Sequence, residues 1–169
     1  MPQNLRSARY LSLGSGGSFN IFPWWNANLQ LEFGYRSLAS PIQGTDFENS
    51  GTSWSGNAEN YFNLPQKWRI SLSGYYSSPS VNGIYRMKAA YLISTGVRKI
   101  FAGDRLTANF NITDIFDTAR FRSTIRYNNI NARWQNEWES RRFNLSLSYS
   151  FGDKKLTPAR NRKTGTGEE

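Results

Sequence analysis

Strict alternation of apolar and polar residues is the feature that most limits what this chain can fold into. In residues 143–151 every second side chain is apolar, at Phe143, Leu145, Leu147, Tyr149 and Phe151. Residues 105–112 repeat the pattern, with apolar side chains at Leu106, Ala108, Phe110 and Ile112. Successive side chains of a β-strand point to opposite faces, so both segments are predicted to be strands with one apolar and one polar face.

Five more segments fit the same period of two less perfectly. They are residues 11–21, 27–35, 54–62, 68–76 and 87–97. Tight turns are predicted at residues 22–25, 64–66 and 101–104, each of which carries Pro, Gly or Asp. Longer polar links are predicted at residues 38–52 and 77–84, with a loop tip near 128–131. The pattern predicts an all-β fold, an antiparallel meander of about seven strands.

The composition excludes several chemistries. The chain contains no Cys and no His, which removes disulfides, zinc clusters and Ser-His-Asp catalysis. The paired carboxylates Asp114 with Asp117, and Glu137 with Glu139, have no predicted cleft between them, so we expect no enzyme activity, metal or cofactor. No apolar stretch approaches the roughly 18 residues of a spanning helix. Residues 1–6 are followed by no apolar segment, so no signal peptide is expected there.

The residues on the two strand faces favour a transmembrane barrel. The polar faces are mostly Ser, Asn, Thr and Gly, and aromatic residues gather beside the short turns, at Trp24, Trp25, Trp68, Phe101, Tyr149 and Phe151. Aromatic girdles around an aliphatic band are typical of outer-membrane barrels, whose interior is polar. The predicted lipid-facing residues are Leu29, Leu31, Phe33, Ile70, Leu72, Leu106, Phe110, Ile112, Leu145 and Leu147. The alternative is a soluble or surface-attached β-sandwich that binds glycans through exposed Trp54, Trp134 and Trp138.

Four stretches of this sequence carry a resemblance to a known family. They are LTANFNITDIFD at residues 106–117, RRFNLSLSYSFG at 141–152, NLPQKWRISLSGYYSSP at 63–79 and TGVRKIF at 95–101. In order and spacing, residues 8–152 resemble the C-terminal barrel part of the TonB-dependent-receptor-like outer membrane β-barrel family of Bacteroidota. The resemblance implies a place in the outer membrane of a Gram-negative bacterium and a role in TonB-coupled uptake.

The resemblance also implies partners. These are the lipid bilayer, the barrel-assembly machinery, and N-terminal barrel strands and a plug supplied from elsewhere. Seven antiparallel strands cannot close into a barrel, because bacterial single-chain barrels use even numbers. Residues 1–152 are therefore interpreted as the C-terminal segment of a larger barrel, and 153–169 as a disordered basic periplasmic tail. The net charge of +9 partly reflects this tail, and nucleic-acid binding is not expected.

Three further expectations concern the C-terminal third. The final alternating residues, Phe143, Leu145, Leu147, Tyr149 and Phe151, resemble the signal that the barrel-assembly machinery recognises. The apolar parity changes between Ile112 and Phe121, which predicts a β-bulge near residues 114–117. Beyond it, Arg120, Arg122 and Arg126 are predicted to share one face, near Trp134 and Trp138, as a candidate extracellular anion contact. The alternative is a solvated hairpin whose arginines pair with Glu137 and Glu139.

Overall fold

The computed structural model describes residues 7–42, 45–127 and 130–151, and almost all of them lie in antiparallel strands. The strands are β1 (Ser7–Phe22), β2 (Trp25–Ile42), β3 (Thr45–Leu64), β4 (Trp68–Ser77), β5 (Ser80–Asn82), β6 (Tyr85–Met87), β7 (Ala90–Phe101), β8 (Leu106–Thr113), β9 (Phe121–Tyr127), β10 (Ile130–Asn136) and β11 (Arg142–Tyr149). Two short 3-10 turns, η1 (Pro65–Lys67) and η2 (Ala102–Asp104), connect strands. Within these ranges no helix is long and apolar enough to cross a membrane.

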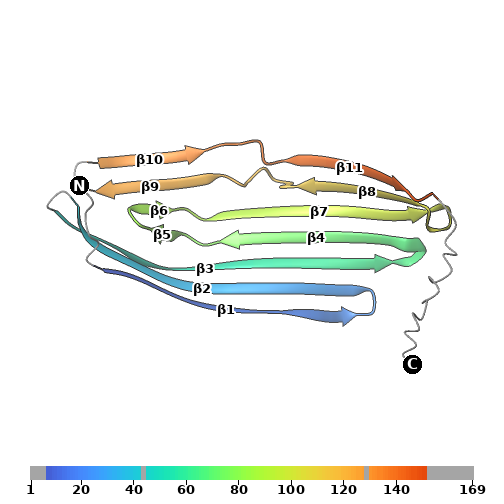
Figure 1. Cartoon of the computed structure of the whole chain (residues 1–169), viewed down its shortest axis with the longest axis horizontal. Helices are drawn as coiled ribbons and strands as arrows, with labels where there is room; N and C mark the ends of the chain where they lie inside the picture. The colour runs from blue at the N-terminus through green and yellow to red at the C-terminus, as the bar shows by residue number, and fades with distance from the viewer. Residues whose placement is uncertain (1–6, 43–44, 128–129, 152–169) are drawn as a thin grey trace, which may run out of the picture.

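The strands form two sheets in one layer (Figure 1). The larger sheet has seven strands in the order β1-β2-β3-β4-β7-β8-β11, and the smaller has four in the order β10-β9-β6-β5. Chain order shows that the smaller sheet continues the larger one, since β4 leads into β5, β6 into β7, β8 into β9 and β10 into β11. The predicted all-β antiparallel fold is confirmed. The seven-stranded sheet is open, with β1 and β11 at its edges.

Tight connections lie together at one end of the larger sheet. The first is a turn at residues 23–24, and the other two are η1 and η2. The η turns reverse the chain with left-handed backbone angles, φ 58° at Gln66 and 61° at Gly103. An ion pair between Lys67 and Asp104 joins these two neighbouring turns. All three connections fall where Pro, Gly and Asp predicted them.

The predicted link over residues 38–52 is wrong. Strands β2 and β3 stay paired from Trp25 opposite Phe62 to Ile42 opposite Thr45, so only residues 43–44, outside the described residues, lie between them. Small polar residues suit a strand as well as a loop when both neighbours supply backbone partners. The predicted link over residues 77–84 contains strand β5, which forms a hairpin with β6 just beyond it. The predicted tip near 128–131 includes residues 128–129, which also lie outside the described residues.

The fold has almost no buried apolar core. Among the described residues Val81 is the one buried hydrophobic side chain, whereas Leu13, Leu145 and Leu147 are each about two thirds exposed or more. A water-soluble single layer would leave an apolar patch far larger than monomeric proteins tolerate. The larger sheet therefore needs an apolar environment on one side.

Candidate functional site

Cross-strand register gives the larger sheet one continuous apolar face. Directly opposed residues of antiparallel strands point to the same side. One row of opposed residues crosses six strands and is apolar throughout: Trp25, Phe62, Ile70, Val97, Phe110 and Leu145. The sheet thus keeps the alternation of its separate strands in phase across nearly its full width.

All ten predicted lipid-facing residues lie on this apolar face. Leu29, Leu31 and Phe33 follow Trp25 at steps of two along β2, and Leu72 follows Ile70 along β4. The remaining residues lie on β8 and β11, where Leu106 opposes Tyr149, Ile112 opposes Phe143 and Ala108 opposes Leu147. That hydrocarbon covers this face stays a prediction.

Aromatic residues border the apolar face at two levels. The belt beside the tight turns contains Trp25, Phe62, Trp68, Phe101 and Tyr149. In it the rings of Trp25 and Phe62 stack at 5.7 Å, and the Lys99 ammonium lies 4.7 Å from the Trp68 ring centre.

A second belt, at the far end of the strands, was missed by the sequence analysis. It contains Tyr35, Trp54, Tyr76, Tyr91 and Phe143, with Trp54 and Tyr76 rings 4.7 Å apart. Nine residues run from Trp68 to Tyr76 and eleven from Tyr91 to Phe101, matching the roughly 9 to 11 residues of a membrane-spanning strand. The sequence could have revealed them as aromatic residues on the apolar face of each strand, one membrane-spanning length from its tight turn.

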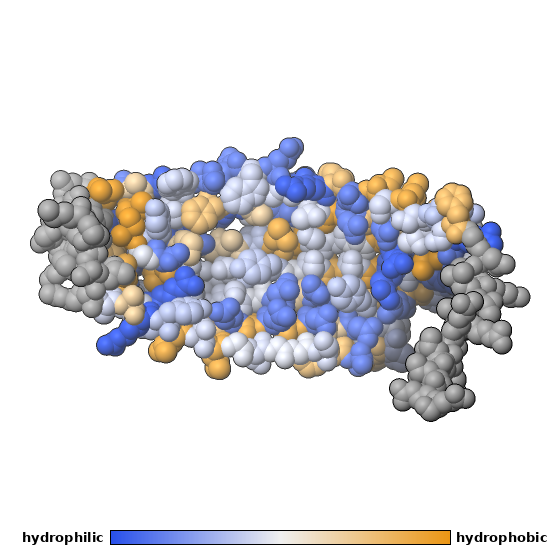
Figure 2. All heavy atoms as spheres, viewed as in Figure 1, coloured by the Kyte–Doolittle hydropathy of each residue, from blue (hydrophilic) through white to orange (hydrophobic). Residues whose placement is uncertain are grey.

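The opposite face of the larger sheet is polar. Figure 2 shows hydrophilic residues over the middle of the visible face of the molecule. Over β1 to β3 this side forms a shallow hollow of about 870 Å³ whose lining includes Ser12, Gly14, Glu32 and Glu59. At Gly96 a Cβ atom would lie 2.3 Å from Asn111 Oδ1, so the glycine makes room for that amide. Serine, glycine and asparagine therefore give this face small polar side chains that water can solvate.

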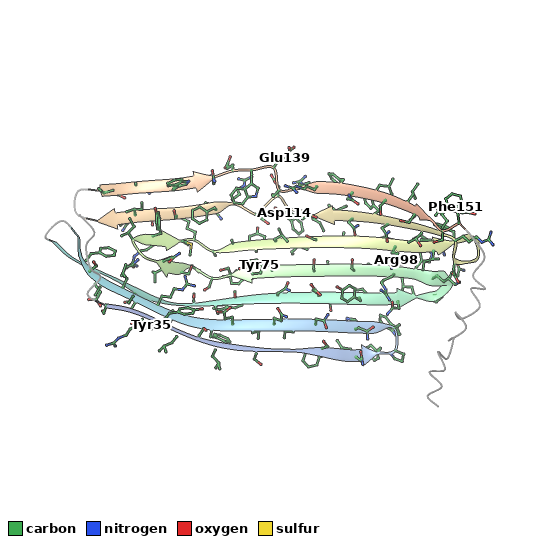
Figure 3. All side chains as sticks on the ribbon, viewed as in Figure 1. Tyr35, Tyr75, Arg98, Asp114, Glu139 and Phe151 are labelled. Atoms are coloured by element: carbon green, nitrogen blue, oxygen red, sulfur yellow. The ribbon has the colours of Figure 1, made fainter. Side chains whose placement is uncertain are left out.

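Asp114 closes a junction where the chain leaves the larger sheet (Figure 3). Its side chain is fully buried and accepts hydrogen bonds from the Thr118 and Ala119 backbone N–H groups at 3.0 and 2.8 Å. The hydroxyl of Ser140, from the connection between β10 and β11, lies 2.5 Å from Asp114 Oδ2 and 3.0 Å from Asp117 Oδ1. The two connections are thus tied together through Asp114.

The predicted one-residue bulge is therefore wrong. Residues 114–120 separate β8 from β9, which belong to different sheets, and both Asp114 and Asp117 have positive φ, 49° and 56°. The parity change arises because the chain leaves one sheet and enters another, and Asp tolerates the left-handed backbone that this requires.

The pKa of Asp114 reflects this junction, which lies beyond the end of β8 and past Phe143 of the far belt. Burial raises the pKa, but hydrogen bonds from Ser140, from the Thr118 and Ala119 backbone and from the Thr118 hydroxyl outweigh it and lower the pKa to about 2. Because the folded pKa is below the unfolded one, the stabilisation is complete above the unfolded value and is lost as pH falls through about 2.

Asp114→Asn is therefore expected to loosen the junction. The amide keeps the shape of the carboxylate but loses its charge-assisted hydrogen bonds, at a cost of about 2 kcal/mol at neutral pH. Measured on the refolded chain, amide hydrogen exchange is expected to become faster in β9 and β10 and to stay unchanged in β8. Glu139→Gln, at an exposed carboxylate of the connection between β10 and β11, is the control. Equal protection in both variants would contradict the role of Asp114.

The structure separates the three arginines predicted to act together. Arg120 lies before β9 and contacts Asp117 and Glu137, each at 3.5 Å. Arg122 and Arg126 are four residues apart in β9, so their side chains point to the same face of the sheet. Trp134 opposes Ser123, so it lies on the other face of that sheet, while Trp138 follows β10. The pairing alternative is right for Arg120 with Glu137, and no Glu139 ion pair occurs among the described residues.

The residues of the predicted assembly signal lie at the open edge of the larger sheet. Phe143, Leu145, Leu147 and Tyr149 belong to β11, which pairs with β8 on one side only. Phe151 follows the strand, is 90% exposed, and lies with its ring 4.6 Å from that of Tyr149. Residues 153–169, the predicted tail, lie outside the described residues.

Comparison with known proteins agrees with this two-faced sheet. The model of the outer membrane protein beta-barrel family matches residues 1–149. No curated protein and no solved structure matches the chain. The family match covers all seven strands of the larger sheet, including the apolar face, its two aromatic belts and the polar face behind them. The chain therefore belongs to the outer membrane protein beta-barrel family, and its seven-stranded sheet is barrel wall.

Proposed function

We propose that this wall belongs to a receptor or transporter of the TonB-dependent type in the outer membrane of a Gram-negative bacterium. In this proposal the chain supplies the C-terminal strands of a larger barrel, and the assembled receptor carries out energy-coupled uptake. The family match supports the wall and implies the membrane. Uptake rests on the resemblance of residues 63–79, 95–101, 106–117 and 141–152 to such receptors.

The observation that carries the proposal is the row of opposed apolar residues from Trp25 to Leu145. It supports a wall because hydrocarbon accepts such a face, while the small polar residues behind it suit a hydrated lumen. The two aromatic belts lie a membrane-spanning length apart. In this proposal the apolar face meets hydrocarbon and the polar face meets water.

The open edges favour a larger barrel. In hydrocarbon every backbone N–H and C=O group needs a partner, so only closed barrels are stable. Within the described residues β1 pairs only with β2, and β11 only with β8. Closing the seven strands on themselves would bring β1 and β11 together in parallel, unlike the even-numbered antiparallel barrels of bacteria. Further strands between β11 and β1 satisfy both edges.

Behaviour without detergent tests the wall against a soluble fold. The purified chain is expected to aggregate in plain buffer and to give soluble, β-rich particles in zwitterionic detergent, because its apolar face and two edges are unprotected in water. Size-exclusion chromatography and circular dichroism measure both. A monodisperse, detergent-free monomer that melts cooperatively would contradict the proposal.

The receptor part of the proposal has a separate test. Cells that carry the complete receptor are expected to lose uptake of its substrate when the energy-coupling protein is deleted, with the amount of barrel in the membrane unchanged. Uptake that persists at the original rate would leave the barrel wall standing and overturn energy coupling.

The β-sandwich alternative lacks its second layer. A sandwich requires another sheet against the apolar face, and the described residues form a single layer (Figure 1). Of the three tryptophans assigned to glycan binding, Trp54 belongs to the far aromatic belt, with its ring 4.7 Å from that of Tyr76. We therefore prefer the wall for the exposed aromatic residues.

A further inference from the structure

A second hollow lies between the tip of β3 and the smaller sheet, at the end of the molecule opposite the tight turns. Its volume is about 460 Å³, in the range of small-molecule sites. The lining residues are Phe47, Glu48, Asn49, Ile84, Arg86, Thr124 and Arg126. They come from β3, from the β5–β6 hairpin and from β9, three segments that sequence spacing does not connect.

This hollow opens on the polar side of the wall. Asn49 and Gly51 have the same parity as Ser53 and Ser55 on the polar face of β3. A Cβ atom at Gly51 would lie 3.3 Å from Val81 Cγ1, so Val81 lies over that face.

The smaller sheet presents the same side to the hollow. Val81 opposes Arg86, and Arg86 opposes Thr124, so all three side chains share one face of that sheet. Arg126 follows Thr124 at a step of two. The arginines therefore face the region that the proposed wall would enclose.

Positive charge is concentrated on this face. Arg122 and Arg133 join Arg86 and Arg126 on it, since Arg122 follows the parity of Arg126 and Arg133 opposes Thr124. Within the described ranges none of these four arginines has a carboxylate within ion-pair distance, in contrast to Arg120. Glu48 is the one acidic residue of the lining, but it has the parity of Trp54, so its side chain belongs to the apolar face of β3. Like charges on one face of a sheet repel, and a bound anion relieves the repulsion.

Asn49 adds a requirement for a hydrogen-bond donor. Its side chain is 3% exposed, and its Nδ2 donates to the Gly83 carbonyl at 2.7 Å and to the Tyr85 carbonyl at 3.5 Å. These two acceptors fix the amide orientation, because a flipped amide would set oxygen against oxygen. Oδ1 is then buried without a donor among the described residues, which is costly. A hydroxyl group that reached this oxygen from the hollow would supply that donor.

We propose that this hollow binds a sugar acid, a small molecule with an anionic group and several hydroxyls. The guanidinium groups of Arg86 and Arg126 bind the anionic group, and Asn49 Oδ1 accepts a hydrogen bond from a hydroxyl. The proposal adds a ligand class to the wall function. It depends only on contacts within this chain.

Calorimetric titration of the detergent-refolded full chain tests the ligand class with three six-carbon probes. Gluconate carries both a carboxylate and hydroxyls, sorbitol carries only hydroxyls, and hexanoate carries only the carboxylate. Gluconate is expected to bind at least about tenfold more tightly than either of the others, since each loses one set of hydrogen bonds. Equal binding of all three, or no binding of gluconate, overturns the proposal.

Arginine variants test the location. Arg86→Gln and Arg126→Gln are each expected to weaken gluconate binding about tenfold or more. Arg98→Gln removes the same charge from the polar face near the tight turns and is expected to leave binding unchanged (Figure 3). Equal loss in Arg98→Gln, or none in the other two, overturns the site. Circular dichroism checks that each variant folds. If the chain folds only in detergent but does not bind gluconate, the ligand proposal is overturned and the wall function stands.

Discussion

Phe110→Arg is expected to destabilise the assembled barrel by about 2 to 4 kcal/mol, the cost of an arginine facing hydrocarbon near mid-membrane. Phe110 lies in the row of opposed apolar residues, between Val97 on β7 and Leu145 on β11. An arginine there deprives Val97 and Leu145 of an apolar neighbour. It also puts a charge where neither adjacent strand offers an acidic side chain directly opposite. Outer-membrane assembly of the complete barrel, followed by its heat-dependent migration on gels, measures the loss.

Asn109→Arg is the matched control for that substitution. Asn109 is the preceding residue on the same strand, and it faces the polar side, where its amide donates to Ser146 at 3.3 Å. A charge on this face meets water, so assembly is expected to stay near normal. If both variants assembled equally well, the assignment of the two faces would be wrong.

Replacing both Tyr149 and Phe151 by serine is expected to abolish insertion of the complete barrel. The assembly machinery is expected to pair its own strand edge with β11, accepting alternate side chains in pockets, as in other cases of strand addition. β11 offers one unpaired edge, and the Tyr149 and Phe151 rings lie together at its end. The amount of folded barrel in the outer membrane measures the effect.

Deletion of residues 153–169 is the companion variant. This segment has no aromatic residue and continues no alternation, so its removal is expected to leave insertion nearly intact. Equal loss from both variants would show that the end of β11 does not carry the signal alone.

The strands were predictable because a period of two depends on local geometry alone. Any strand between a polar and an apolar surface must alternate, so residues 105–112 and 143–151 could be assigned without knowing their neighbours. The extent of β2 and β3 could not be predicted, because the small polar residues of 38–52 are equally common in loops. Only the backbone pairing of Arg36 with Gly51 and its neighbours distinguishes the two.

The hollow lined by Asn49, Arg86 and Arg126 was only partly predictable from the sequence, for a different reason. Arg122 and Arg126 were found because they alternate on one strand. Arg86 and Asn49 join them only through the packing of the β5–β6 hairpin against β3, a contact between residues 34 or more positions apart. Arg120 has the parity of Arg122 and Arg126, which suggested the same face, but it lies in the seven-residue break before β9 and contacts Asp117 and Glu137 instead.

The junction at Asp114 has a consequence for how such proteins diversify. The β9–β10 hairpin joins the wall through two connections fastened by one carboxylate and the Ser140 hydroxyl. The register of this hairpin is set by the pairing of β9 with β6 and with β10. These pairings are separate from the pairing of β8 with β11. Mutations that lengthen, shorten or recharge this hairpin are expected to leave the register of the apolar face unaltered. Selection can therefore reshape this end of the molecule while the wall stays the same.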